Sequence, residues 1–322
     1  MSISIEQVVA CIPDWHGKSV NVQPLSGGLT NTNYTVEVDG TPYVVRIPGA
    51  STELLAVDRA NEYHNTKAAA EAGVTPKIAH YLHDFDVMVL EFIHGETMSI
   101  ARLQGPGMPA RMAASLKKLH AGPRFLHDFN MFRLTEFYLK IVDEHQVRIP
   151  DGYRGYMPKV ARIEAAMARH PLPTVPCHND LLAENYIDDG QMLWLIDFEY
   201  SGNNDPTFEL GNTCQEQQFD EPRLIEMCAA YFGAAGASAS PARADARQDG
   251  ALGGPHPDKL ARMKLNMIMS DVGWTLWAAI QAKISTIDFD FWGWAVERWG
   301  RAAAKMDAPE FEKWLEDVRR GS

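Results

Sequence analysis

Long hydrophobic runs are absent from this 322-residue chain. No stretch approaches the roughly 18 consecutive apolar residues that a membrane-spanning helix needs, so we expect no membrane span. The first residues, MSISIEQVVACIPDWHG, lack a basic segment followed by a long apolar run. They therefore do not have the pattern of a secretory signal peptide, and we expect a cytoplasmic location.

Cysteine is also scarce. The four cysteines are Cys11, Cys177, Cys214 and Cys228; none forms a CxxC pair or has the spacing of a metal site. This pattern argues against a zinc centre and against a disulfide framework, and it agrees with a reducing compartment. We expect these cysteines to be small buried hydrophobic residues.

Basic residues are outnumbered, with 30 Lys and Arg against 42 Asp and Glu, a formal net charge of −12. No long run of Lys and Arg occurs, so we expect neither nucleic acid nor an anionic lipid surface as a partner. The composition is ordinary for a globular protein, with 46% hydrophobic and 22% charged residues. The length suggests two domains or one large two-lobed unit.

The first part of the chain has the pattern of strands. Short β-branched or aromatic runs occupy 20–27, 33–38, 43–47, 77–82 and 87–92. Asp39-Gly40 predicts a hairpin turn between the second and third runs. Residues 51–72 have a helical pattern that Gly73 would end.

Beyond Glu91–Pro109, a segment rich in Gly and Pro, helical patterns dominate. They cover 108–121, 133–146, 156–169, 221–232, 259–285 and 288–306, with one hairpin formed by 185–188 and 191–197. Residues 233–258 contain one large aliphatic residue and no aromatic one, which predicts a mobile inserted loop. We therefore expect an α+β fold with a small antiparallel β lobe (1–94) and a mainly helical lobe (95–322).

The segment His178–Asn185 (HNDLLAEN), followed by IDFE at 196–199, is the densest chemical pattern. Phosphoryl transfer from a nucleotide needs a group that accepts the proton of the attacking hydroxyl, and oxygen ligands that hold Mg²⁺ against the phosphates. Asp180 suits the first role, and Asn185 and Asp197 suit the second as hard oxygen ligands. H-x-D-x-x-x-x-N before a hairpin that ends in D-F is the arrangement of kinase catalytic and metal loops. His178 is expected to support the loop rather than to act as acid or base.

The N-terminal part offers candidates for the rest of a nucleotide site. A glycine-rich turn between two strands could bring backbone N–H groups near phosphates, through Gly27, Gly28, Thr30 and Asn31. Its sequence, SGGLTN, matches neither GxGxxG nor a Walker P-loop.

Three further positions in this part fit nucleotide binding. Arg46 ends the third strand, where a kinase places its phosphate-pairing cation, and Glu62 could orient that cation from the following helix. Glu91 and Ile93, after an apolar strand, would form the hinge whose backbone meets adenine.

With these motifs, the sequence resembles the choline/ethanolamine kinase family, which has the aminoglycoside-phosphotransferase-like, protein-kinase-related fold. The resemblance runs from about Leu25 to Met306 and rests on VVRIPG around Arg46 and on IDFEYSGNNDPTFELGNTCQE from Ile196. It implies ATP and Mg²⁺, with Asp180 as base and Glu216 near the cation of the substrate. The family commonly has Asp where this chain has Glu209, which we interpret as a structural anchor of the metal loop.

Five of the eight tryptophans fall between positions 274 and 299. Trp274 and Trp277 lie three residues apart and would share a helix face. A quaternary ammonium has no N–H donor, so it is recognised by aromatic faces and a carboxylate. WTLWAAIQAKIST resembles the family helix that lines the choline pocket, and Trp294 takes the place of an aromatic residue that closes the cage. We assign Trp292 and Trp299 to packing or surface.

The leading hypothesis is therefore an ATP-dependent kinase for the hydroxyl of choline or a closely related amino-alcohol. Kinases for ethanolamine, thiamine or an aminoglycoside are alternatives within the same fold. A catalytically silent ligand-binding homologue is an alternative from another functional class. The sequence does not indicate the oligomeric state or a preference for ATP over GTP.

Overall fold

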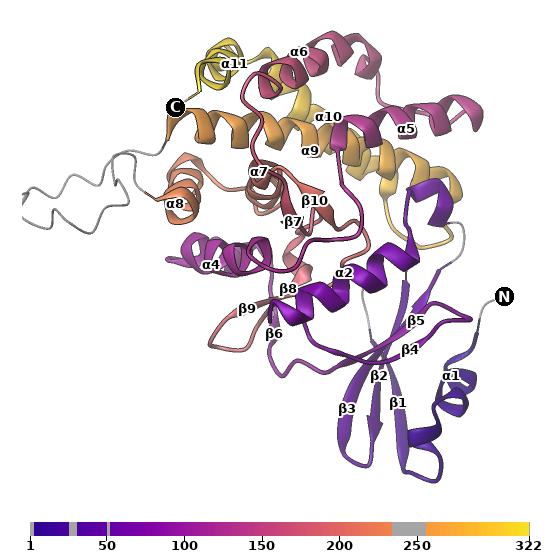
Figure 1. The fold of residues 1–322 in the computed structure, drawn as a ribbon. Helices are drawn as coiled ribbons and strands as arrows, with labels where there is room; N and C mark the ends of the chain where they lie inside the picture. The colour runs from indigo at the N-terminus through magenta and orange to yellow at the C-terminus, as the bar shows by residue number, and fades with distance from the viewer. Residues whose placement is uncertain (1–2, 26–30, 50–51, 234–255, 322) are drawn as a thin grey trace, which may run out of the picture.

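The computed structural model describes residues 3–25, 31–49, 52–233 and 256–321 (Figure 1). Its N-terminal lobe is built on one antiparallel sheet. The strands are β1 (Val20–Leu25), β2 (Asn31–Val38), β3 (Thr41–Pro48), β4 (Ile78–Leu82) and β5 (Val87–Glu91), in the spatial order β1-β2-β3-β5-β4. Asp39 and Gly40 both have positive φ, which suits the tight β2–β3 turn. All five predicted strands are thus confirmed, with ends shifted by at most two residues within the described residues.

One face of this sheet forms the core of the lobe. Val36, Val45 and Val89 are completely buried in it, and α1 (Ile5–Cys11) covers it with the short 3-10 helix Pro13–Trp15. Trp15 packs against Tyr43 with ring centroids 5.5 Å apart. Since successive side chains of a strand point to opposite faces, residues two apart such as Val36 and Val38, or Val45 and Ile47, share this face.

The predicted helix 51–72 is divided into two parts, which corrects the sequence analysis. A 3-10 turn covers Thr52–Leu55 and α2 covers Arg59–Glu71. Ala56 has a φ of 59°, and the Asp58 side chain caps α2 by accepting hydrogen bonds from two of its backbone N–H groups. An Asp at this position favours a new helix start over continuation. In Figure 1, α2 lies between the sheet and the helical lobe.

The helical lobe surrounds one long helix, α9 (Pro257–Ile284), which is buried along almost its whole length. Helices α5, α7, α10 and α11 pack on α9. The remaining helices are α3 (Ile100–Leu103), α4 (Met108–His120), α5 (Met131–Glu144), α6 (Met157–Met167), α7 (Pro206–Glu216), α8 (Glu221–Phe232), α10 (Phe291–Asp307) and α11 (Glu310–Arg320). Six of these, with α9 counted, were predicted; α3, α7 and α11 were not.

Short strands line the side of the helical lobe that faces the sheet. They are β6 (Glu96–Thr97), β7 (Val175–Cys177), β8 (Tyr186–Asp188), β9 (Leu193–Leu195) and β10 (Gly202–Asn204). The predicted hairpin is the β8–β9 pair, and β7 pairs with β10. These strands carry the segments Cys177–Asn185 and Ile196–Ser201 toward the sheet. Most of the predicted loop 233–258 lies outside the described residues.

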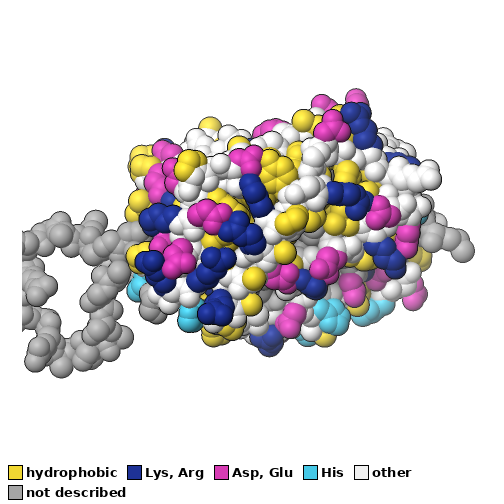
Figure 2. All heavy atoms as spheres, turned by 90° about the horizontal axis from the view of Figure 1, so that it is seen from above, with side chains coloured by type: hydrophobic (Ala, Val, Ile, Leu, Met, Phe, Trp, Pro, Cys, Tyr) yellow, Lys and Arg dark blue, Asp and Glu magenta, His cyan; other side chains and the backbone are white. Residues whose placement is uncertain are grey.

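Acidic and basic side chains alternate on the outer face of the helical lobe (Figure 2). Arg162 of α6 pairs with Glu312 of α11 at 2.5 Å, and Lys159 pairs with Asp307 at 2.6 Å. Within the described residues, no helix is both long enough and apolar enough to cross a membrane. Three cysteines are buried as expected, whereas Cys11 is exposed.

Candidate active site

A cavity of about 700 Å³ lies where the sheet meets the helical lobe. It is lined by most of the residues that the sequence singled out: Arg46, Glu91, Ile93, Asp180, Asn185, Asp197, Glu216, Trp274, Trp277 and Trp294. These residues are distributed over more than 240 positions of the chain, yet they border one continuous space. Asn31 and Glu62 do not line the cavity, but each contacts a residue that does: Asn31 contacts Glu199, and Glu62 contacts Arg46. Gly27, Gly28 and Thr30 lie outside the described residues.

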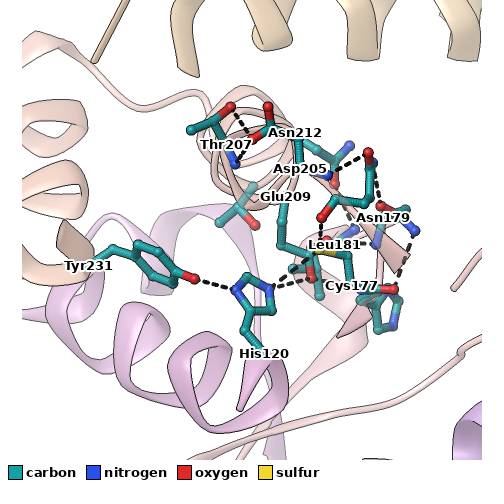
Figure 3. Close-up of polar contacts among 12 residues, drawn as sticks. His120, Cys177, Asn179, Leu181, Asp205, Thr207, Glu209, Asn212 and Tyr231 are labelled. Atoms are coloured by element: carbon teal, nitrogen blue, oxygen red, sulfur yellow. Dashed lines mark hydrogen bonds and ion pairs between the residues drawn. The ribbon is translucent and has the colours of Figure 1, made fainter. Parts of the chain in front are cut away.

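Helix α7 holds the loop that carries Asp180 in place (Figure 3). The two carboxylate oxygens of Glu209 accept separate hydrogen bonds from the backbone N–H groups of His178 (2.9 Å) and Asn179 (2.7 Å). Asn212, one turn further along α7, accepts from the Leu181 N–H at 2.9 Å. Glu209 therefore anchors the catalytic loop, which corrects its assignment to the metal loop. Asn179 has a φ of 69°, and such unusual backbone persists only where the surroundings fix it.

Behind Glu209 lies a buried polar group that the sequence analysis did not find. His120 Nε2 lies 3.9 Å from Glu209 Oε1, and His120 Nδ1 lies 2.6 Å from the Tyr231 hydroxyl (Figure 3). These residues come from α4, α7 and α8, so the catalytic loop rests on three helices at once.

His178 supports the loop, as expected. Its Nε2 donates to the Ile196 carbonyl at 2.7 Å, and its Nδ1 accepts from the Asp180 N–H at 3.3 Å. Burial lowers the pKa of His178, which agrees with this neutral form. Asn185 donates from Nδ2 to the Asp180 carbonyl at 2.8 Å, so its amide oxygen is the atom suited to a metal.

The Asp180 carboxylate lines the cavity. Burial raises its pKa well above the ordinary value, and the charges of Glu216 and Asp197 add to this effect. A carboxylate with a raised pKa is a stronger proton acceptor, which suits a general base.

Arg46 connects the two lobes. Its Nη2 lies 2.6 Å from Asp197 Oδ1 and 3.1 Å from Glu62 Oε1. Burial alone would lower the pKa of Arg46, but these two carboxylates raise it, so the guanidinium stays charged. Burial would likewise raise the pKa of Asp197, and the Arg46 charge holds it below its ordinary value. Asp197 thus remains ionised at neutral pH.

Two further charged residues complete this group. Arg59, the first residue of α2, lies 2.6 Å from Glu62 and 3.5 Å from Glu199. Asn31 donates to Glu199 at 3.2 Å, which ties the end of the glycine-rich segment to the metal loop. Burial, with the nearby Asp197 charge, raises the pKa of Glu199 to about 8.

The residues at this end fit a nucleotide with Mg²⁺. Arg46 Nε is buried and has no hydrogen-bond partner among the described residues, so it is available to a phosphate oxygen. Asp197 and Asn185 offer hard oxygen atoms, which Mg²⁺ prefers. Glu91 and Ile93 border the same cavity with apolar residues such as Val44 and Leu90, which suits a planar base. No set of three or more His, Cys, Asp or Glu that could hold a metal occurs in the described part of the chain.

Aromatic rings gather at the other end of the cavity. Trp277 lies 6.5 Å from Trp274 and 5.7 Å from Trp294, centroid to centroid, with the planes steeply inclined. Two more rings, missed in the sequence analysis, border this end: Tyr200 lies 4.9 Å from Trp274, and Phe289 lies 5.8 Å from Trp294. The predicted shared face of Trp274 and Trp277 is thus present. Trp292 stacks on Arg148 instead, and Trp299 packs on Tyr153.

Glu216 is already engaged by the protein. Arg298 donates to both of its oxygens, at 2.5 and 2.7 Å, and the Arg298 guanidinium lies 3.9 Å from the Trp294 ring centroid. Trp294 and Glu216 therefore bind an internal cation, although both also line the cavity. The contact between Arg298 and Trp294 could have been expected, since the two residues lie one turn apart on a helical pattern.

Comparison with known proteins agrees with this geometry. The pattern of the Phosphotransferase enzyme family matches residues 21–247. A solved choline/ethanolamine kinase family protein from Mesorhizobium loti is 35% identical, superposes with a TM-score of 0.81, and the alignment covers 98% of both chains.

Two other proteins extend the comparison. Ethanolamine kinase 2 of Mus musculus is 28% identical over an alignment 320 residues long, and the alignment covers 90% of this chain and 77% of that protein. The structure of choline kinase LicA from Streptococcus pneumoniae has a TM-score of 0.73 at 24% identity, covers 94% of this chain and 98% of LicA, and shares the fold.

Proposed function

The chain belongs to the phosphotransferase enzyme family and, within it, to the choline/ethanolamine kinases, and from that premise we propose that its acceptor substrate is choline. It is a small-molecule kinase with a protein-kinase-like fold that binds a nucleotide and acts on an amino-alcohol. Which amino-alcohol, and which residues perform the chemistry, are the subject of the proposal.

The proposal for choline rests on the chemistry of the aromatic end. Trp274, Trp277 and Phe289 present π faces or edges to the cavity, whereas the nearby Glu216 carboxylate is paired at both oxygens with Arg298. A primary ammonium needs hydrogen-bond acceptors for its N–H groups, but a trimethylammonium needs aromatic faces. The surroundings therefore suit a quaternary cation better than a primary amine.

Each remaining role follows from position. Asp180 would accept the proton of the choline hydroxyl while the hydroxyl oxygen forms a bond to the γ-phosphorus of ATP. The bond from the γ-phosphorus to the bridging oxygen breaks, and ADP leaves with that electron pair. Arg46 would contact the phosphates, and Glu62 would hold Arg46 in place. Asn31, Glu91 and Ile93 would bind the nucleotide, with Gly27, Gly28 and Thr30 at its phosphates.

Mg²⁺ would be held by Asn185 and Asp197. When bound, such an ion neutralises the charge of the phosphate oxygens. The cavity needs this compensation because it is lined by seven carboxylate residues and three arginines: Glu91, Asp180, Glu184, Asp197, Glu199, Glu216 and Glu297 against Arg46, Arg298 and Arg301.

The test is a panel of alcohols incubated with Mg-ATP and followed by ADP release: choline, ethanolamine, thiamine and an aminoglycoside. We expect choline to give the highest kcat/KM. A higher kcat/KM for any other alcohol would overturn the choice of choline and leave the kinase assignment intact. If ADP release stays at the background rate with every alcohol although Mg-ATP binds, the chain is a silent homologue.

Ethanolamine is the second candidate. It is favoured by the mouse relative named ethanolamine kinase, which aligns over most of its length. The two substrates differ by three methyl groups, so the aromatic residues should decide between them.

A further inference from the structure

A row of alternating charges forms the wall behind the aromatic end of the cavity. Arg298 lies between Glu216, which it contacts at both oxygens, and Asp271, at 3.6 Å. Arg301 lies 2.6 Å from the same Asp271 oxygen and 3.4 Å from Glu297. Three helices supply the row: Glu216 is on α7, Asp271 on α9, and the other three residues are on α10.

Asp271 differs from the other four members because it does not face the cavity. Glu216, Glu297, Arg298 and Arg301 all line the cavity, whereas Asp271 is completely buried behind the two arginines. With all groups ionised, the three carboxylates and two guanidinium groups of the row sum to a charge of −1. Lys305 of α10 also faces Asp271, but it does not line the cavity and is not part of the row. Without the Asp271 charge the row would be neutral, and two arginines of the wall would share only two carboxylates.

We propose that Asp271 is a positioning residue that determines specificity: by pairing with Arg298 and Arg301 from behind, it keeps the wall negative and so favours a cationic alcohol over a neutral one of the same shape. The inference rests on the proposed function and concerns the same site. Charge attraction that is not screened by bulk water remains effective over several ångströms, which lets a buried group act on a substrate that it does not touch.

The groups that face Asp271 support its ionised form. Arg298, Arg301 and Lys305, all on α10, lower its pKa, while burial raises it, with a net pKa of about 6. Asp271 is therefore mostly charged at pH 7.5, where a kinase assay is run.

The experiment compares choline with its neutral carbon isostere, 3,3-dimethylbutan-1-ol, in the wild type and in Asp271→Asn. We expect the variant to raise KM for choline roughly three- to tenfold, as expected for losing one charge near a partly screened site. KM for the neutral alcohol and for ATP should change less than twofold. Asp307→Asn, which removes the ion pair between the last residue of α10 and Lys159 of α6, serves as the matched control and should change neither value.

A second variant separates charge from packing. Asp271→Asn combined with Arg301→Gln removes one charge of each sign, so it should restore KM for choline to within about twofold of the wild type. An equal rise in KM for both alcohols, or no recovery in the double variant, would overturn the proposal. If Asp271→Asn does not fold, as judged by its thermal transition, Arg301→Gln alone makes the comparison. It removes a positive charge from the wall, so KM for choline should fall while KM for the neutral alcohol stays the same, and an unchanged KM for choline would overturn the proposal. A wild type that phosphorylates no amino-alcohol would refute the proposed function instead, before the variants are compared.

Discussion

Arg46 of β3 and Asp197 of the metal loop are joined by a 2.6 Å contact that crosses from the sheet to the helical lobe. The same guanidinium nitrogen also contacts Glu62, so one side chain holds two acidic groups from different parts of the fold. A lysine has one ammonium point charge and cannot reproduce the planar, forked geometry. The pair therefore determines both where the Arg46 guanidinium lies and how acidic Asp197, the proposed metal ligand, is.

Replacing Arg46 by Lys should raise KM for ATP roughly tenfold or more and lower kcat. Arg46 lowers the pKa of Asp197 by its hydrogen bond as well as by its charge, and a lysine keeps the charge but not the forked contact. The variant should therefore also move the acidic limb of the kcat/KM profile toward higher pH. Steady-state kinetics between pH 5 and 8 measure both effects. Arg111→Lys is the control, since Arg111 pairs with Asp188 at 2.6 Å and does not line the cavity. An unchanged profile would contradict the electrostatic coupling.

Replacing Asp180 by Asn keeps the shape of the side chain and removes its ability to accept a proton. We expect kcat to fall by roughly 10²–10⁴-fold, the range for loss of a general base. KM for ATP should stay within a few-fold, because Asp180 is assigned to the acceptor hydroxyl. Activity of Asp180→Asn or Asp180→Ala within tenfold of the wild type, with saturating choline and ATP, would exclude Asp180 as the base.

Replacing Trp274 by Ala should affect choline more than ethanolamine. A cation–π contact contributes about 0.5–2 kcal/mol, so KM for choline should rise by up to about 30-fold. Trp274→Phe keeps an aromatic face and should recover most of the loss. Trp292→Ala is the control, because Trp292 stacks on Arg148 outside the cavity lining. Equal losses for both alcohols would favour a packing role for Trp274.

Glu209 offers a prediction that concerns stability as well as rate. Glu209→Gln replaces one of the two carboxylate oxygens by an NH2 group, which cannot accept a hydrogen bond. The backbone N–H of either His178 or Asn179 then loses its acceptor, at a site that is completely buried. An unsatisfied buried donor costs about 1–3 kcal/mol, so the free energy of unfolding should fall by this amount and kcat should fall with it. Denaturant unfolding measures the first value. Glu316→Gln, which removes an exposed ion pair with Arg320, should lower the free energy of unfolding by less than about 0.5 kcal/mol.

The sequence predicted those parts of the fold whose residues carry a local pattern. The strands of the first lobe are β-branched or aromatic runs, and the Asp39-Gly40 turn has its own signature, so both could be inferred without a structure. Helix α7 could not, because all eleven of its residues are buried, polar ones such as Glu209 and Asn212 included, so no exposed face sets a helical period. Helix α11 could have been found, since Phe311, Leu315 and Val318 are spaced as one buried helix face.

In the candidate site, too, the residues of a local motif could be predicted and the residues brought together by packing could not. Asp180, Asn185 and Asp197 lie within 18 positions in a recognisable order, so the motif placed them together before the structure did. Arg298 and Asp271 have no such motif: their contacts with Glu216 and Arg301 arise where α7, α9 and α10 pack against one another. Such long-range pairs depend on tertiary packing, which a single sequence does not display.

The ionisation of Asp271 leads to a pH prediction of its own. Its pKa of about 6 lies above the ordinary value for Asp, because burial disfavours the charged form more than Arg301 and Arg298 favour it. As the pH falls from 7.5 to 5, Asp271 takes up a proton, the wall of Glu216, Glu297 and the two arginines loses its net negative charge, and KM for choline should rise. The folded state binds this proton more tightly than the unfolded chain does, so the same protonation stabilises the fold and the loss of affinity is not due to unfolding.

Other groups near the substrate, such as Asp180, also titrate, so the measured quantity is the ratio of KM for choline to KM for 3,3-dimethylbutan-1-ol in the wild type and in Asp271→Asn. The ratio should rise toward low pH in the wild type and stay flatter in the variant; parallel curves would show that Asp271 does not set the preference for a cation.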